Sequence, residues 1–538
     1  MEETTNGSQR VPGANGGDRV TPEFLGRIVG DSVLSLRFRA RYGVDLYVGD
    51  ILVAEDEESG HQYLLRVLDV RFGCEATAED WMERTAGTML RLETGDGPAP
   101  LGDREWRLYK TGVCAILGYL RDGTFLKAKT IPGHFARVRR ADARDYDFLR
   151  EYAGDLEVGF LRSGEDVVPI PVGIDGQKSF PYHVGVFATT GMGKSNLMKV
   201  LAASALARGR YGLLILDPHG EYYDGASPRR KGLVHHPMAK RNLVVYSHRP
   251  LAGPHHFIRL AAQEIDAPDV MNIYEFSGPQ RELLSAARHR YGRDWLLAIR
   301  DKSAEEMRAD FGGQFHEGTV QVIKRRIERI FRNQLVHGDG TVTVTGAIVE
   351  QLRDGKTVLV DTGGLFETEE LLVATVLARA VFERNKDAFG TPEFESFAPV
   401  LVTLEEAQRV LGKGATASAN VFAQIAREGR KFKTGLCAIT QQPKLLDTEV
   451  ASQFNTLFIL GLADARDREI LRESAKQDVS RLENEIQTLM PGEALVTSPY
   501  APFAVPLTVH LYEEHLARAA RLAPAPVPAA APAGKDFY

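Results

Sequence analysis

The feature that most constrains this chain is a phosphate-loop sequence placed between a strand and a helix. Residues 188–195 read ATTGMGKS; an apolar run at 183–188 leads into them, and a helical pattern follows at 194–208. The GxxxxGK[ST] motif needs this context, because loop N–H groups and the helix N-terminus hold phosphate together. Ala188 replaces the first glycine, which the loop tolerates if φ stays negative there. The sequence therefore predicts a nucleotide-binding α/β core.

The predicted nucleotide contacts are seven consecutive loop residues: Thr190, Gly191, Met192, Gly193, Lys194, Ser195 and Asn196. Lys194 is expected to reach the β- and γ-phosphates, and the Ser195 hydroxyl is expected to ligate Mg²⁺. ATP and Mg²⁺ are therefore the predicted cofactors.

A phosphate loop needs a carboxylate from a neighbouring buried strand, and two strands compete for this role. One strand ends in Asp217, and the strand at 400–404 is followed by Glu405 and Glu406. The pair fits better, since Glu405 can hold Mg²⁺ through water while Glu406 polarises the attacking water. The alternatives are that the pair caps the next helix and that Asp217 lies beside the nucleotide.

Two later segments complete the predicted site. Gln441 follows a buried strand at 436–440, where an amide can sense the γ-phosphate; a simple strand-end turn is the alternative. Residues 426–431 read AREGRK and place three cations around a glycine. That arrangement suits an arginine finger for a neighbouring subunit, or a solvated helix end.

Before the phosphate loop, short apolar runs are broken by turn residues, which indicates a small β-barrel at residues 22–150. A disordered leader is expected at 1–21. The predicted strands fall within 25–30, 44–56, 61–73, 87–97 and 106–120. Residues 141–152 then indicate a helical or linking segment.

Beyond the barrel, buried strand patterns alternate with helical patterns and predict a doubly wound parallel sheet. These strands fall at 213–217, 243–246, 357–361, 400–404, 436–440 and 456–460. The core is expected at 151–263 and 339–505, interrupted by a helical insertion at 264–338. Within the insertion, Val320, Ile323 and Ile327 share one helix face. The opposite basic face is interpreted as solvated, and contact with DNA or a partner is the alternative. A strand and helix at 506–522 and a flexible Ala/Pro tail at 523–538 follow.

Charge and cysteine content exclude several classes of protein. With 66 Lys and Arg against 72 Asp and Glu, the net charge is −6, which still permits nucleic acid to bind a locally basic ring or cleft. The 3 cysteines lie far apart without a CxxC pair, so we expect neither a disulfide framework nor a Cys-rich zinc module. No apolar run approaches the ~20 residues of a membrane span. The predicted location is the cytoplasm, without a membrane anchor.

Seven segments in this order resemble the HerA-type ATPases of the HerA/FtsK superfamily of ring-forming DNA translocases: TTGMGKS, LDPHGEY, LVTLEEAQ, IAREGRKFKTG, TQQP, SQFNTLFILGL and PGEAL. The resemblance implies a HAS-barrel, a RecA-like core, a homo-hexamer and duplex DNA in a central channel. By the same resemblance Lys194 and Ser195 are the Walker A pair and Glu405 and Glu406 the Walker B pair.

The resemblance further makes Gln441 the sensor amide and Arg430 the arginine that acts in trans, with Arg427 as its rival. The chain departs from the family pattern at three positions: Glu405 stands where Asp is more common, and Gln408 and Gln442 where His and Arg are usual. Since a longer acidic side chain can still reach Mg²⁺ through water, we expect an active ATP hydrolase.

The expected function is that of a DNA translocase or helicase. The resemblance implies a NurA-type nuclease, or another effector, docked on the barrel face, and a role in DNA end resection and double-strand break repair. The alternative is a nucleotide-gated ring scaffold for an effector enzyme in an anti-phage defence complex.

Overall fold

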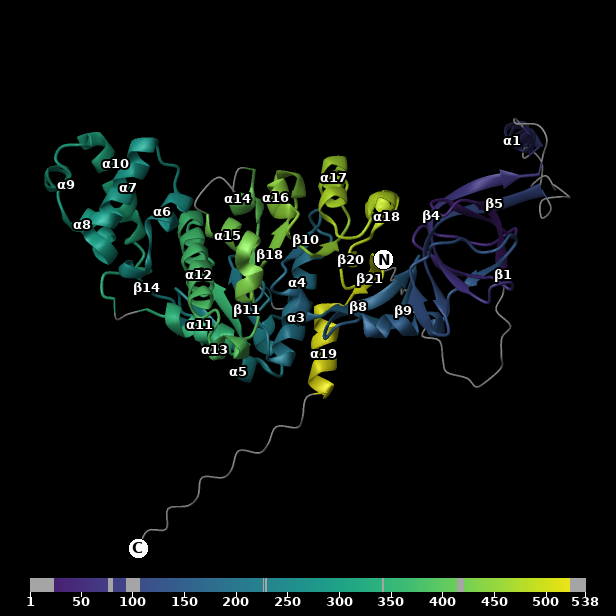
Figure 1. Cartoon of the computed structure of the whole chain (residues 1–538), viewed down its shortest axis with the longest axis horizontal. Coiled ribbons are helices and arrows are strands. Elements are labelled where there is room, and N and C mark those ends of the chain that lie inside the picture. The colour runs from purple at the N-terminus through teal and green to yellow at the C-terminus, as the bar shows by residue number, and fades with distance from the viewer. Residues whose placement is uncertain are drawn as a thin grey trace, which may run out of the picture. The chain divides into compact units, whose positions relative to one another are not determined.

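The computed structural model describes residues 24–75, 81–92, 107–225, 227, 230–340, 343–413 and 420–522. The chain divides into two compact units, one formed by Met1–Leu46 and Ile51–Asp142 and the other by Tyr47–Asp50 and Ala143–Tyr538 (Figure 1). The predicted leader at 1–21 and the predicted Ala/Pro tail at 523–538 lie outside the described residues.

Six of the described strands close an antiparallel barrel in the first unit, in the order β2-β1-β7-β3-β4-β5, with β2 pairing back to β5. They are β1 (Phe24–Asp31), β2 (Leu36–Ala40), β3 (Ile51–Glu55), β4 (Gln62–Cys74), β5 (Leu108–Arg121) and β7 (Arg137–Arg140), and β6 (Thr124–Leu126) extends from β5. Alternate residues such as Leu36, Phe38 and Ala40 point inward and are buried, as a half-buried strand requires. The predicted small barrel is confirmed.

One predicted barrel strand is wrong. Residues 87–97 were expected to be extended, but α1 (Trp81–Leu92) is helical, and the rest of that segment lies outside the described residues. Trp81, Thr85 and Met89 are partly covered whereas other described residues of α1 are exposed. Their spacing of four places them on one helix face, a period that the short run at 87–92 did not reveal.

The second unit is built on one twelve-stranded sheet with a parallel part and an antiparallel part. The parallel strands, in spatial order, are β13 (His256–Phe257), β12 (Leu243–Ser247), β16 (Thr357–Asp361), β11 (Gly212–Asp217), β17 (Val400–Leu404), β18 (Thr434–Thr440), β10 (Val184–Phe187) and β19 (Thr456–Ile459). The sheet continues with the antiparallel strands β20 (Glu493–Thr497), β21 (Val505–Val509), β8 (Leu156–Ser163) and β9 (Asp166–Ile174). The predicted α/β core with its parallel sheet is confirmed.

The β8–β9 hairpin was not foreseen. Pro169 and Pro171 in β9 argue against a strand in the sequence, because proline cannot donate to the ladder. β9 is the last strand of the sheet, which is where proline is tolerated.

Helices pack around this sheet (Figure 1). They are α3 (Gly176–Ser179), α4 (Lys194–Arg208), α5 (Ala239–Asn242), α11 (Thr345–Arg353), α12 (Glu367–Asp387), α13 (Pro392–Ser396), α14 (Gln408–Leu411), α15 (Val421–Glu428), α16 (Thr448–Ala451), α17 (Ala465–Ser474), α18 (Glu483–Thr488) and α19 (Tyr512–Leu522). None of the helices in the described ranges is long and apolar enough to cross a membrane.

The predicted helical insertion is also confirmed. It contains α6 (Ala267–Ile273), α7 (Gly278–Tyr291), α8 (Trp295–Asp301), α9 (Ala304–Asp310) and α10 (Glu317–Ile330), which group together in Figure 1. The apolar face of α10 is buried, as expected. Its basic face is partly used within the insertion: Lys324 donates to the carbonyls of Ile299 and Arg300 at the end of α8, at 2.9 and 3.0 Å.

A buried ion pair ties the insertion to the core. Arg379 of α12 donates to both carboxylate oxygens of Asp269 in α6, at 3.0 and 2.7 Å. The Asp269 side chain is 1% exposed, and burial raises its pKa. Removing one partner of such a pair leaves an uncompensated charge in a low-dielectric site.

We expect Asp269→Asn to lower the free energy of unfolding by about 3 kcal/mol, because Arg379 keeps its charge without a counter-charge. Urea unfolding followed by the fluorescence of buried Trp295 measures this change. Glu383→Gln is the matched control, since Glu383 also pairs with Arg379 but its side chain is 53% exposed. Equal destabilisation by the two variants would contradict the assigned role of the pair.

Candidate functional site

The phosphate loop lies between β10 and α4, as predicted. Gly191 and Gly193 have φ values of 84° and 100°, which side chains other than glycine rarely adopt. Ala188 is not among the residues with positive φ, so its methyl group is compatible with the loop. The loop N–H groups and the start of α4 therefore form the concave anion-binding end expected of this motif.

A cleft of about 610 Å³ opens at the carboxyl ends of β10, β11, β17 and β18. The predicted residues that line it are Thr190, Gly191, Gly193, Lys194, Ser195, Asn196, Glu405, Glu406 and Gln441. Parallel strands bring their carboxyl ends to one edge, which explains how residues so distant in sequence meet. Met192 and Arg430 are not among the lining residues.

The acidic pair begins where β17 ends. The Tyr222 hydroxyl donates a hydrogen bond to Oε1 of Glu405 at 2.6 Å. Burial raises the pKa of the Glu405 carboxyl, while this hydrogen bond and the charge of Lys194 oppose that rise. Burial also lowers the pKa of Lys194, against the opposite pull of Glu405 and Glu406. Lys194 and Glu405 both line the cleft, and the charge of each partly offsets the effect of burial on the pKa of the other.

Two amides hold the Glu406 carboxylate. Gln441 Nε2 donates to its Oε1 at 3.3 Å, and Gln408 Nε2 donates to its Oε2 at 2.6 Å. Glu406 has a φ of 49°, an uncommon value for a side chain of this size. That backbone conformation turns the chain directly after β17.

The amide contacts extend into a chain of hydrogen bonds across the site. The Thr440 hydroxyl donates to Oε1 of Gln408 at 2.6 Å, and the Thr190 hydroxyl of the phosphate loop donates to Oε1 of Gln441. We call the series Thr440–Gln408–Glu406–Gln441–Thr190 the amide relay. It joins the ends of β17 and β18 to the loop that would hold the phosphates.

Asp217 holds the loop that follows β11. Its carboxylate accepts backbone hydrogen bonds from Glu221, Tyr222 and Tyr223, each at 3.0 Å. Burial raises its pKa, and the three N–H donors oppose that rise. These bonds fix the loop that presents Tyr222 to Glu405. Asp217 also lines the cleft, so its place beside the nucleotide and the Mg²⁺ role of Glu405 both stay predictions.

Asn196 lines the cleft, but its amide is engaged elsewhere. Its Nδ2 donates to the carbonyl of His510 at 2.8 Å, and its Oδ1 accepts from the N–H of Tyr512 at 2.9 Å. The first turn of α4 is thereby joined to the start of α19, and Leu511 and Glu513 join the cleft lining. Direct nucleotide contact by the Asn196 side chain stays a prediction.

Both candidate finger arginines lie at the other edge of the sheet. Arg430 precedes β18 and lies over the ring of Tyr182, which precedes β10, at 4.9 Å from the ring centre. β18 has 7 residues, so its two ends are roughly 20 Å apart at ~3.3 Å per residue. Arg427 pairs with Glu449 at 3.0 Å. Neither arginine lines the cleft of its own chain.

Sequence reasoning missed several residues of the cleft. Tyr222 lies in the LDPHGEY segment without a predicted role, and no motif singles out Glu370 of α12 or Arg409 of α14. Burial raises the pKa of Glu370. A signal existed for Tyr222, because a tyrosine that follows a strand end beside a phosphate loop carries a hydroxyl within reach of the site.

Comparison with known proteins shows a similarity to HerA helicases. Residues 156–381 match the family model described as the central domain of helicase HerA. A probable helicase of Methanocaldococcus jannaschii is 27% identical over 73% of this chain and 74% of its own length. The DNA double-strand break repair helicase HerA of Saccharolobus solfataricus is 24% identical over 71% of this chain and 74% of its own length.

Among solved structures, the plasmid coupling protein TrwB in complex with a non-hydrolysable GTP analogue covers 64% of this chain and 88% of its own, with 14% identity and a TM-score of 0.45. Residues 156–381 thus match the central domain of helicase HerA, and the chain is similar over 71–73% of its length to helicases that include HerA.

Proposed function

We propose that this chain is an ATP-driven DNA translocase that forms a ring and works with a partner nuclease in DNA end resection and double-strand break repair. The names of its HerA relatives support the DNA and repair parts of this proposal. The positions of the site residues support the ring. The phosphate loop, Glu405, Glu406 and Gln441 line the cleft, whereas Arg430 and Arg427 do not. The nuclease partner is drawn from the family alone.

In the cleft, the chain's own groups have separable tasks. The loop N–H groups and the Lys194 ammonium bind the phosphates of ATP. Glu406, held by two amides, orients the attacking water and accepts its proton. Gln441 contacts both Glu406 and Thr190, so it lies where a departing γ-phosphate changes its surroundings.

The donor set of the cleft fits Mg²⁺. The ion prefers oxygen ligands and is typically held through one or two carboxylates together with substrate phosphates. The Ser195 hydroxyl and the Glu405 carboxylate, both in the cleft lining, would hold it. When bound, Mg²⁺ neutralises charge on the β- and γ-phosphate oxygens.

The proposed ring follows from the position of Arg430. An arginine that stabilises the charge of phosphoryl transfer must reach the phosphates, and Arg430 is roughly 20 Å from its own loop along β18. A head-to-tail arrangement of subunits can bring one chain's Arg430 to the next chain's cleft, and such an interface generates a ring when its rotation closes.

Linear duplex DNA should stimulate ATP hydrolysis, and Lys194→Ala should abolish hydrolysis with or without DNA, because the phosphates lose their cation. Steady-state phosphate release measures this. Lys240→Ala, at an exposed position of α5, is the control and should retain both activities. Hydrolysis that is indifferent to DNA at low salt would contradict translocation.

Tyr222→Phe should lower kcat for ATP hydrolysis by about tenfold while nucleotide binding persists, since a hydrogen bond to a carboxylate is worth roughly 1.5–3 kcal/mol. The matched control is Tyr223→Phe, because the Tyr223 hydroxyl contacts Gly253 outside the cleft. An unchanged kcat in Tyr222→Phe would show that the function of Glu405 does not depend on the hydrogen bond from the Tyr222 hydroxyl.

Arg430→Ala should reduce hydrolysis by ~10³-fold or more, as for arginine fingers supplied in trans. Mixing it with Lys194→Ala should restore activity, because roughly a quarter of the interfaces in a randomly mixed ring then combine an intact Lys194 with an intact Arg430. Phosphate release from the mixture, compared with each variant alone, measures this restoration. Restoration by Arg427→Ala but not by Arg430→Ala would assign the finger to Arg427.

A further inference from the structure

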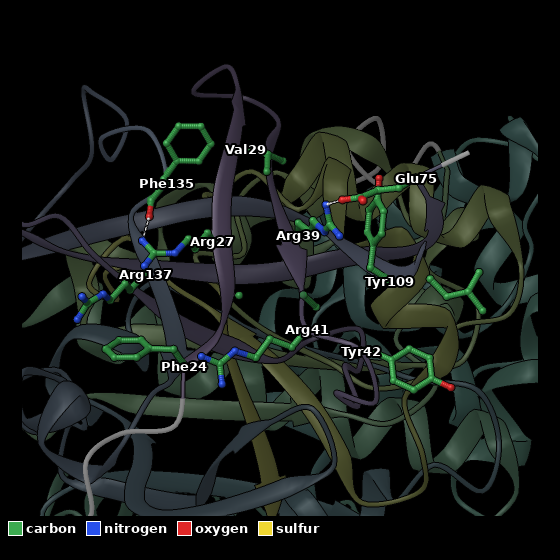
Figure 2. Close-up of a pocket in the computed structure, with 13 residues that line it drawn as sticks. Phe24, Arg27, Val29, Arg39, Arg41, Tyr42, Glu75, Tyr109, Phe135 and Arg137 are labelled. Atoms are coloured by element: carbon green, nitrogen blue, oxygen red, sulfur yellow. Dashed lines mark hydrogen bonds and ion pairs between the residues drawn. The ribbon is translucent and has the colours of Figure 1, made fainter. Parts of the chain in front are cut away.

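A second cleft, of about 910 Å³, lies on the barrel over β7, β1, β2 and the start of β5 (Figure 2). We call it the barrel cleft. Its lining includes four arginines, which are Arg27, Arg39, Arg41 and Arg137, and one acidic residue, Glu75. The ATPase chemistry uses none of these side chains.

The arginines are arranged by strand register. Arg137 of β7 pairs with Arg27 of β1, and Arg27 pairs with Arg39 of β2. Like charges placed directly opposite on neighbouring strands destabilise a sheet. Three arginines in one row across three strands therefore cost the barrel stability, and an anion that bridges them removes that cost.

Small residues form the floor beneath this row. Gly26 pairs with Ala40, and a Cβ atom at Gly26 would lie 2.0 Å from the carbonyl oxygen of Arg39. The strands therefore approach closely between the arginines, and the surface is hollow there because neither residue has a long side chain.

Two aromatic rings contact arginines of the barrel cleft. The Arg39 guanidinium lies 4.1 Å from the ring centre of Tyr109, and the Arg137 guanidinium lies 5.0 Å from that of Phe24. These stacked contacts hold the guanidinium planes in place and reduce the entropy lost when they bind a ligand.

Two further rings are exposed to solvent. Tyr42 is 45% exposed and Phe135 is 63% exposed. Phe135 has a φ of 62°, which is rare for a bulky residue, and its carbonyl accepts a hydrogen bond from Arg27 at 2.8 Å. The backbone thus holds an apolar ring in water at the rim of a basic cleft (Figure 2).

Acidic groups only partly neutralise the row. Glu75 pairs with Arg39, and Glu57 lies 3.3 Å from Arg137. The Arg41 side chain makes no hydrogen bond or ion pair with any residue in the described ranges, and it is exposed. The barrel cleft therefore keeps a net positive charge.

We propose that the barrel cleft binds single-stranded nucleic acid. Phosphates lie along the row of Arg137, Arg27 and Arg39, and bases stack on Tyr42 and Phe135. A basic groove with accessible rings is the arrangement by which proteins bind single strands without reading sequence. An acidic peptide would satisfy the arginines but would give the exposed rings no planar partner. The proposal goes beyond the motor, because this contact needs no ATP.

The test is fluorescence anisotropy of the full chain with a labelled oligothymidylate of about 15 nucleotides, without ATP or Mg²⁺. Replacing both Arg27 and Arg137 by Gln should weaken binding at least tenfold and reduce the slope of log Kd against log salt by about 1.4. Arg121→Gln, an exposed arginine of β5 outside the barrel cleft, is the matched control and should bind as the parent does.

A second variant tests the rings without changing charge. Tyr42→Ala together with Phe135→Ala should weaken binding by about tenfold or more, with the salt slope unchanged. Photo-crosslinking of an iodouracil oligonucleotide should mark peptides that contain Tyr42 or Phe135. Crosslinks confined to other peptides, or displacement of the oligonucleotide by polyglutamate of equal charge, would overturn the proposal.

The outcome is separable from the motor. Lys194→Ala should still bind the oligonucleotide, and the Arg27/Arg137 variant should keep its basal ATP hydrolysis. If duplex DNA fails to stimulate ATP hydrolysis by the parent while the oligonucleotide still crosslinks to Phe135, the proposal of translocation is contradicted and that of single-strand binding in the barrel cleft is supported. If duplex DNA stimulates ATP hydrolysis and the oligonucleotide binds all variants equally, the proposal of single-strand binding in the barrel cleft is contradicted and that of translocation is supported.

Discussion

The carboxylate of Glu406 is held between two amides, and the rest of the nucleotide site is arranged around that clamp. Its φ of 49° turns the chain immediately after β17, so that the side chain meets Gln441 and Gln408. Because Gln441 also contacts Thr190 of the phosphate loop, the amide relay joins that loop to Glu406, the residue proposed to orient the attacking water. In the proposed function, a change at the phosphates reaches Glu406 through these contacts.

The relay also explains how the chain accommodates an unusual residue. Gln408 stands where the resemblance leads one to expect His, yet its amide donates to Glu406 and accepts from Thr440. An amide carries both a donor and an acceptor without any dependence on protonation. Tyr222 provides a second brace at Glu405, on a loop that Asp217 holds through three backbone hydrogen bonds. Both acids are thus positioned by hydrogen bonds from side chains of the same chain.

The sequence was sufficient where short-range pattern and motif agree. Short apolar runs broken by turn residues predicted the barrel, buried runs predicted the parallel strands, and the loop at 188–195 located the cleft. The sequence was insufficient where contacts between distant segments determine the structure. The helix at 81–92 shows its period only over its full length, and a proline-rich strand such as β9 is tolerated only because it is an edge. The position of Tyr222 after a strand end is visible in the sequence, but its contact with Glu405 depends on a loop that Asp217 fixes.

The central claim is that ATP hydrolysis in this cleft moves the chain along duplex DNA. Displacement of a triplex-forming oligonucleotide from linear duplex DNA measures such movement directly. The account predicts displacement with ATP, none with a non-hydrolysable analogue and none in Lys194→Ala. Sustained ATP hydrolysis on the same DNA without any displacement would contradict it.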